Sequence, residues 1–287
     1  AEVFGGWSTG RVDGWVRRTS IGLSRQHDTY VVEPGLLPPA QLPQDQKLVA
    51  PFVRIELIED RFEKVRNRNL IDRTEFFALG FGSTLQLGRA AAGWGSSRDA
   101  WLYSGSVSRG FVPLPEHTLL ASAAISGQYS GSGVRRQTAG GQAQYYVPQS
   151  KLWLFYASAN GDMLTKPDAA DALLLGGDNG LRGYPLRYQS GTRRALFTFE
   201  ERAYTDVYLY RLFRIGGAVY FDAGRAWGGN VLNTANPGWL RSAGVGLRIF
   251  STRAAFSNVI HVDVASPIDS DSNVKKLQFL VKTETSF

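Results

Sequence analysis

The sequence has no cysteine, one methionine and only three histidines among its 287 residues. Without cysteine the chain can form neither a disulfide nor a thiolate metal site, which suits passage through an oxidising compartment. The histidines, His27, His117 and His261, stand far apart in the sequence, which argues against a histidine metal site or a catalytic triad. We therefore expect no metal and no cofactor.

Motifs of catalysis are missing too. Residues 130–133 read Ser-Gly-Ser-Gly, which lacks the spacing of a nucleophile elbow and is typical of a tight hairpin. The acidic run at 269–273 begins like a calcium loop, but Val274 and Leu280 stand where such a loop needs glycine and glutamate. The sequence thus indicates that the protein is not an enzyme.

Long hydrophobic runs are also absent, so no segment can cross a membrane as a helix. Mean hydropathy is slightly negative, which alone is typical of a soluble protein. A membrane-spanning strand, however, places apolar side chains at every second position, and its mean hydropathy stays near zero. No signal peptide opens the chain at Ala1, which indicates a processed or trimmed chain.

Apolar and polar residues alternate over long segments of this chain. Between 243 and 249, Val245 and Leu247 share one face and Arg248 lies on the other. The same pattern recurs in the segments 77–88, 119–129 and 256–264. A tilted strand needs about 10–12 residues to cross a bilayer, whereas the strands of a soluble sandwich average about 5–6. The predicted fold class is therefore all-β, a transmembrane antiparallel β-barrel.

This pattern predicts about twelve strands. They are expected at 11–30, 50–63, 73–89, 99–111, 118–130, 134–147, 150–164, 192–204, 213–224, 238–250, 255–265 and 275–287. An even number puts both termini on one side of the membrane, and the long connections 31–49, 165–191 and 225–237 indicate the extracellular side. Both termini are thus expected in the periplasm, with residues 1–14 as an N-terminal periplasmic segment and 15–287 as the barrel.

Tryptophan and arginine support the same interpretation. Most tryptophans lie near the ends of the predicted strands, as the aromatic girdles of a membrane barrel require, whereas a soluble sandwich would bury them in mid-strand. The formal net charge is +7. The arginines recur singly between apolar neighbours, as Arg54 does, and form no basic stripe. This distribution favours a charged lumen over a nucleic-acid partner.

Three short motifs follow one another in the second half of the chain. Residues 176–185 read Gly-Gly-Asp-Asn-Gly-Leu-Arg-Gly-Tyr-Pro, residues 198–200 read Thr-Phe-Glu, and residues 220–224 read Tyr-Phe-Asp-Ala-Gly. In this order and spacing they resemble a loop and the strands after it in the outer-membrane assembly and secretion barrels, the BamA, TamA and TpsB superfamily of bacterial surface antigen type. The resemblance is clear over 150–287 and implies a long extracellular loop folded into the lumen.

Alternation turns Glu200 and Asp222 toward the lumen. The resemblance implies that the loop offers Arg182 to these two carboxylates as a structural clamp, and the planar fork of arginine suits such pairing. The other residues of the loop motif are Gly180, Leu181, Gly183 and Tyr184, and its glycines permit the positive φ angles of a tight tip. An ordinary flexible surface loop is the alternative.

The last strand resembles the folding signal of exported barrels, with Phe279, Val281 and a terminal Phe287. Thr283 and Thr285 depart from that pattern because they are only weakly apolar. The chain also departs from the family by lacking periplasmic POTRA domains and four of its sixteen strands. A trimmed chain and a natural short form both fit, and the even strand count favours the short form.

Two function classes stay open. The resemblance implies that the protein inserts or translocates polypeptides or lipid-linked cargo at the bacterial outer membrane, with a weak seam between strands 11–30 and 275–287. The alternative is a passive pore or the membrane anchor of an oligomeric assembly. The expected partners are outer-membrane lipids, lipopolysaccharide, a polypeptide client and a second copy in a homodimer. The dimer is expected because Val3, Phe4 and Trp7 would lie uncovered in a monomer.

Overall fold

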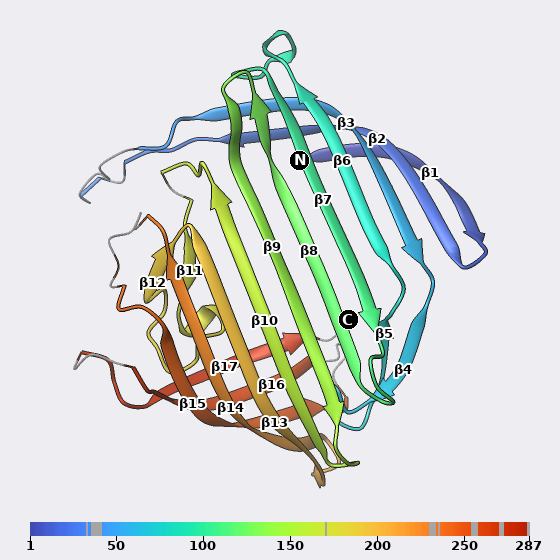
Figure 1. Cartoon of the computed structure of the whole chain (residues 1–287), viewed down its shortest axis with the longest axis vertical. Helices are drawn as coiled ribbons and strands as arrows, with labels where there is room; N and C mark the ends of the chain where they lie inside the picture. The colour runs from blue at the N-terminus through green and yellow to red at the C-terminus, as the bar shows by residue number, and fades with distance from the viewer. Residues whose placement is uncertain are drawn as a thin grey trace.

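The computed structural model describes residues 1–32, 34–35, 42–169, 171–229, 234, 236–253, 258–269 and 273–285. Its main element is an antiparallel sheet of thirteen strands, which neighbour one another in chain order (Figure 1). They are β1 (Glu2–Val12), β2 (Trp15–Asp28), β3 (Gln46–Glu59), β6 (Gly82–Ala90), β7 (Ala100–Phe111), β8 (Thr118–Ser130), β9 (Gly133–Pro148), β10 (Trp153–Thr165), β13 (Arg193–Leu209), β14 (Phe213–Trp227), β15 (Leu240–Ser251), β16 (Asn258–Pro267) and β17 (Gln278–Thr285). Among the described residues, no helix has the length and apolar character needed to cross a membrane.

The two faces of the sheet differ in chemistry. On β14, Val219 is 60% exposed on the outer face, whereas its neighbour Tyr220 is 3% exposed on the inner face. Figure 1 shows that β13 to β17 curve back, so that the inner face partly encloses a space, which we call the lumen. The predicted all-β antiparallel fold is confirmed. In the described part of the chain, however, no pairing joins β1 to β17, and the sheet is open.

The first strand of the sheet corrects the predicted strand count. Residues expected to precede the barrel form β1, which pairs with β2 so that Gly6 lies opposite Ser20. The sheet therefore has thirteen strands and not twelve. Because neighbouring strands are antiparallel, an odd number puts Glu2 and Thr285 at opposite ends of the sheet. The expectation that both termini lie on one side does not hold for this sheet.

The same strand removes the premise of the dimer argument. Val3 and Trp7 lie on the outer face of β1, and Phe4 lies on the inner face, where the guanidinium of Arg54 stacks 5.0 Å from its ring centroid. These residues belong to a strand of the sheet, so an uncovered terminal segment no longer calls for a second copy.

The connections at the two ends of the sheet differ in length. One end, which we call the loop end, carries the connections 29–45, 91–99, 166–192, 228–239 and 268–277, together with the two-residue turn 131–132. The other end, the turn end, carries 13–14, 112–117, 149–152, 210–212 and 252–257, which are short. Its exception is residues 60–81, between β3 and β6, which contain the hairpin of β4 (Phe62–Arg66) and β5 (Thr74–Ala78).

This hairpin corrects the predicted strand 73–89. Alternation runs without interruption through that segment, but the structure divides it into β5 of the hairpin and β6 of the sheet. The chain turns where the amides of Leu79 and Gly80 both donate to the carbonyl of Arg61, each at 2.9 Å. Alternation places Phe77 and Leu79 on the same face as Leu85 of that segment, but both are buried whereas Leu85 is exposed. Alternation identifies two faces but does not reveal which sheet a strand joins.

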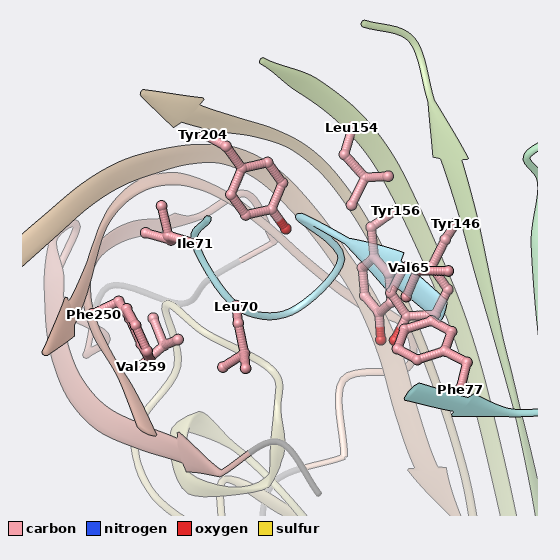
Figure 2. Close-up of a cluster of buried hydrophobic side chains, with 10 residues drawn as sticks. All are labelled: Val65, Leu70, Ile71, Phe77, Tyr146, Leu154, Tyr156, Tyr204, Phe250 and Val259. Atoms are coloured by element: carbon pink, nitrogen blue, oxygen red, sulfur yellow. The ribbon is translucent and has the colours of Figure 1, made fainter. Parts of the chain in front are cut away.

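The hairpin packs against the inner wall at the turn end. Ile71 and Leu70, on the loop between β4 and β5, point into a cluster of apolar and aromatic side chains (Figure 2). The cluster consists of Val65, Leu70, Ile71, Phe77, Tyr146, Leu154, Tyr156, Tyr204, Phe250 and Val259. Burying so much apolar surface fixes the hairpin inside the lumen. The cluster also shows which side chains of β10 face the lumen: Leu154 faces inward and Trp153 faces outward.

Candidate functional site

The connection 166–192 folds back into the lumen from the loop end. Its short strands β11 (Leu173–Leu175) and β12 (Gln189–Gly191) pair with each other and lie inside the curve of β13 to β17 (Figure 1). Leu175 and Leu181 are fully buried against Leu196 of β13 and Leu240 of β15. The connection is thus a packed element and not a flexible surface loop. We call it the inserted loop.

The tip of the inserted loop needs glycine at two positions. Gly180 and Gly183 have φ angles of 93° and 92°, in the left-handed region that other residues rarely adopt. A Cβ at Gly183 would also lie 2.9 Å from the Cβ of Ser242 on β15. The two glycines flank Leu181 and Arg182, so the turn they form directs the Leu181 side chain into the core and the Arg182 side chain toward the wall.

Arg182 lies against Asp222 and Glu200, which come from neighbouring strands. Its Nε and Nη2 donate to the two carboxylate oxygens of Asp222, each at 2.8 Å, and its Nη1 donates to Oε1 of Glu200 at 2.6 Å. The guanidinium also stacks on the ring of Tyr220, 3.4 Å from its centroid. All three residues predicted to form the clamp therefore meet in one buried site.

The charge state of Arg182 follows from these contacts. Burial by itself lowers the pKa of Arg182, but the hydrogen bonds and charge of Asp222, together with the charge of Glu200, outweigh burial and hold that pKa well above its ordinary value. Arg182 is therefore a permanent cation, and a buried cation is stable only with such partners.

The clamp is part of a larger ionic network that sequence reasoning missed. Arg202 donates from Nε to Oε2 of Glu200 at 2.7 Å, and Arg248 donates from Nη1 to Oδ1 of Asp263 at 2.6 Å. The first pair shares Glu200 with the clamp. The second joins the clamp through Asp263, whose Oδ2 lies 3.8 Å from Nη1 of Arg182, and through Arg248, whose Nη2 lies 3.7 Å from Oε1 of Glu200. Three guanidinium groups thus balance three carboxylates.

Cross-strand register explains why these partners were missed. Asp263 lies opposite Gly246, and Arg248 lies two residues further along β15, so its side chain folds back over the glycine. A Cβ at Gly246 would overlap both Arg248 and Asp263. Alternation alone indicates that Arg248 and Asp263 face inward, but only the register brings them together.

Arg202 extends the network to the hairpin at the turn end. Its Nη1 donates to the carbonyl of Arg68 at 2.8 Å, and its guanidinium stacks 3.8 Å from the centroid of the Tyr156 ring. The carboxylate of Glu75 accepts the amides of Arg68 at 2.8 Å and Asn69 at 2.9 Å, which fixes the loop that Arg202 contacts. An unbroken series of contacts therefore connects the inserted loop to the hairpin.

Tyr184 attaches the inserted loop to the loop end of the sheet. Its hydroxyl donates to the carbonyls of Arg241 and Asp269, at 3.0 Å and 2.9 Å. Burial raises the pKa of Tyr184 to about 12, so the hydroxyl keeps its proton and stays a donor. The loop motif is therefore held at two depths, by Tyr184 at the rim and by Arg182 inside.

Two of the cavities on the inner face border the inserted loop. One, of about 1090 Å³, lies between the hairpin and the inserted loop and is lined by charged and polar groups that include Gln142, Arg182, Glu200, Arg202, His261 and Lys282. The other, of about 900 Å³, follows the wall of β6 to β10, and its lining combines small hydroxyl and amide side chains with glycines, alanines and the Asp162–Arg194 ion pair. The described residues contain no group of three or more acidic or histidine side chains placed to hold a metal ion.

The predicted folding signal is described only in part. Phe279 and Val281 are exposed on the outer face of β17. Phe287 lies outside the described residues.

Comparison with solved structures identifies the fold. CdiB from Escherichia coli aligns over 100% of this chain and 53% of its own, with a TM-score of 0.51 and 13% identity. The chain has the fold of CdiB. BamA from Haemophilus ducreyi lacking POTRA domains 1–3 aligns over 99% of this chain and 69% of its own, with a TM-score of 0.43 and 11% identity. The sequence matches no family model and no curated protein.

The chain spans about half the length of CdiB. Five strands of the sheet, β13 to β17, follow the inserted loop, the number that alternation predicted after residue 191.

Proposed function

We propose that this protein is a barrel of the bacterial outer membrane that moves or inserts polypeptides, with the inserted loop and the hairpin as its two movable parts. One observation carries the proposal. The series of contacts from Arg182 through Glu200 and Arg202 to Arg68 joins an insert from the loop end to an insert from the turn end. A passive pore has no need for two occluding elements that share one ionic network.

The outer face supports the membrane location. Large apolar side chains such as Leu85, Val219 and Val245 are exposed along the outer face of the strands, and a soluble protein rarely exposes so wide an apolar surface. Long connections belong to the extracellular side in outer-membrane barrels and short turns to the periplasmic side. The loop end is therefore extracellular and the turn end periplasmic in our proposal.

The second cavity suits a polypeptide in transit. Its lining includes Ser104, Ser106, Ser122, Ser126 and Thr138, which offer hydrogen bonds without fixed charge. Transport requires contacts that are strong enough to admit the cargo and weak enough to release it. Neutral hydroxyl groups meet both requirements for a peptide backbone better than the arginines of the clamp do.

Conductance across a planar lipid bilayer tests the proposal. We expect a small conductance from the wild-type protein and a larger one from Arg182→Ala, because the inserted loop then leaves the lumen more often. A reduced, alkylated model polypeptide added to the turn-end side should produce brief current blocks in the variant.

Ser20→Ala is the matched control, because Ser20 lies on the inner face of β2 and lines neither of the two cavities. It should conduct like the wild type. A large, steady wild-type conductance that the polypeptide leaves unchanged would instead support a passive pore or membrane anchor.

A further inference from the structure

The outer face of the sheet contains an apolar groove that the proposed function does not use. Its floor is formed by small residues that lie directly opposite one another across four strands, namely Ala123, Gly141, Gly161 and Ala195. Its volume is about 960 Å³, within the range of roughly 300–1,000 Å³ found for small-ligand sites. Leu85, Val107 and Ile125 border one side of the groove, and Met163 and Trp227 border the other.

Two arginines lie beside this groove: Arg193 is part of its lining at the loop end, and Arg225 lies on the adjacent strand, opposite Ala195 of the floor. Arg193 of β13 pairs with Trp227 of β14, and Arg225 lies two residues before Trp227 on the same outer face. Within the described part of the chain, neither arginine has an acidic partner, and Nε of Arg225 is buried without a hydrogen-bond acceptor. By contrast, Arg241 on the next strand forms a 2.6 Å ion pair with Asp269.

The groove and the arginines would bind two chemically different parts of one ligand. The apolar floor calls for a hydrocarbon chain, and two unpaired guanidinium groups call for an anion such as phosphate, which arginine binds bidentately. Trp227 lies at the same level, and tryptophan concentrates at the depth of lipid headgroups. A soluble anion would leave the groove empty, and a neutral lipid would leave the arginines unpaired.

We propose that this groove binds a phosphorylated glycolipid of the outer leaflet, of the lipid A type, with one acyl chain on the small-residue floor and a phosphate on Arg193 and Arg225. The proposal rests on the membrane location and orientation given above, but not on polypeptide transport. The site faces the membrane, and the sheet separates it from the lumen.

Native mass spectrometry in mild detergent tests the proposal with three lipids: diphosphorylated lipid A, its dephosphorylated form and phosphatidylglycerol. We expect wild-type protein to retain diphosphorylated lipid A best. Arg193→Glu combined with Arg225→Glu should bind it about tenfold or more weakly, because charge-assisted bonds to phosphate are lost.

Two further variants separate charge from shape. Gly141→Leu fills the groove floor and should weaken binding while both arginines remain. Arg17→Glu is the matched control, because Arg17 is an exposed arginine of the outer face near the turn end, and it should bind lipid A like the wild type.

Heat-modifiable gel mobility verifies that each variant is folded. Equal lipid A binding by the wild type and both groove variants would overturn the proposal. So would a preference for phosphatidylglycerol that the double charge reversal removes. Because the bilayer conductance of these variants should stay unchanged, failure here and failure of the transport proposal can be told apart.

Discussion

The two halves of the inner wall are built in opposite ways. The half formed by β13 to β16 carries five charged side chains that pair with one another and with Arg182 of the inserted loop, most of them nearly inaccessible to solvent. The half formed by β6 to β10 carries small hydroxyl and amide groups around an open cavity, and Asp162 in the lining of that cavity pairs with Arg194 of β13 where the two halves meet. Buried charges tolerate only one geometry, because each must keep its partner. Small neutral groups impose no such geometry.

This difference indicates which part of the molecule holds the inserts and which part leaves room. Both inserts contact the charged half, the inserted loop through Arg182 and the hairpin through Arg202. The polar cavity of the other half is bordered by the inserted loop only at Asn179. A movement of the inserts would thus break contacts on one side and open space on the other.

Removing a carboxylate of the clamp should have the largest effect. Asp222→Ala leaves Arg182 without its bidentate partner, and loss of one member of a buried pair costs about 3–5 kcal/mol. We expect faster limited proteolysis within 166–192 while the sheet stays folded.

The corresponding change on the other half of the wall, Ser122→Ala, should shift stability by about 0.5 kcal/mol or less. If both variants resisted the protease like the wild type, the inserted loop would not depend on the clamp and the contrast between the halves would fail.

Loss of hairpin packing should have a somewhat smaller effect. Ile71 is 1% exposed in the cluster at the turn end, and truncating such a residue costs about 2–5 kcal/mol. Ile71→Ala should increase hydrogen exchange in β4 and β5 and, through Arg202, slightly in the inserted loop.

Phe76→Ala is the control, because Phe76 lies on the same hairpin but is 63% exposed. Equal exchange in the two variants would show that the cluster does not hold the hairpin.

The smallest predicted effect is a pH dependence of the hairpin. Burial raises the pKa of Glu75 above its ordinary value of 4.5, although the backbone amides of Arg68 and Asn69 oppose the shift. A carboxyl whose pKa is raised on folding contributes most stability below the unfolded pKa and loses it as pH rises through the folded pKa. Amide protection in the hairpin, corrected for intrinsic exchange, should therefore fall as pH increases from 4.5.

Glu75→Gln, which keeps a neutral side chain at every pH, should remove this dependence. A wild-type hairpin whose protection rises over the same interval would contradict the prediction.

The sequence predicted the loop and its two carboxylates because three motifs occur in a fixed order, so each supports the others. It also predicted the faces of strands such as β14, where Val219 and Tyr220 alternate in polarity. It did not predict β1, since Gly5, Gly6 and Gly10 interrupt the apolar pattern there.

The hairpin and the pairs beyond the clamp were missed for different reasons. β5 has the alternation of a wall strand, and nothing local distinguishes an insert from a wall. Arg248 and Asp263 meet only through the register of β15 and β16, which depends on the whole sheet and not on any short segment.

Gly246 has no side chain, yet the ionic network depends on it. The space above its Cα is occupied by the Arg248 and Asp263 side chains, so any larger residue displaces them. In a saturation mutagenesis experiment, this position should therefore reject substitutions as strictly as the charged residues do. A map of tolerated substitutions along β15 would then show that Gly246, like the charged residues of the ionic network, accepts almost none.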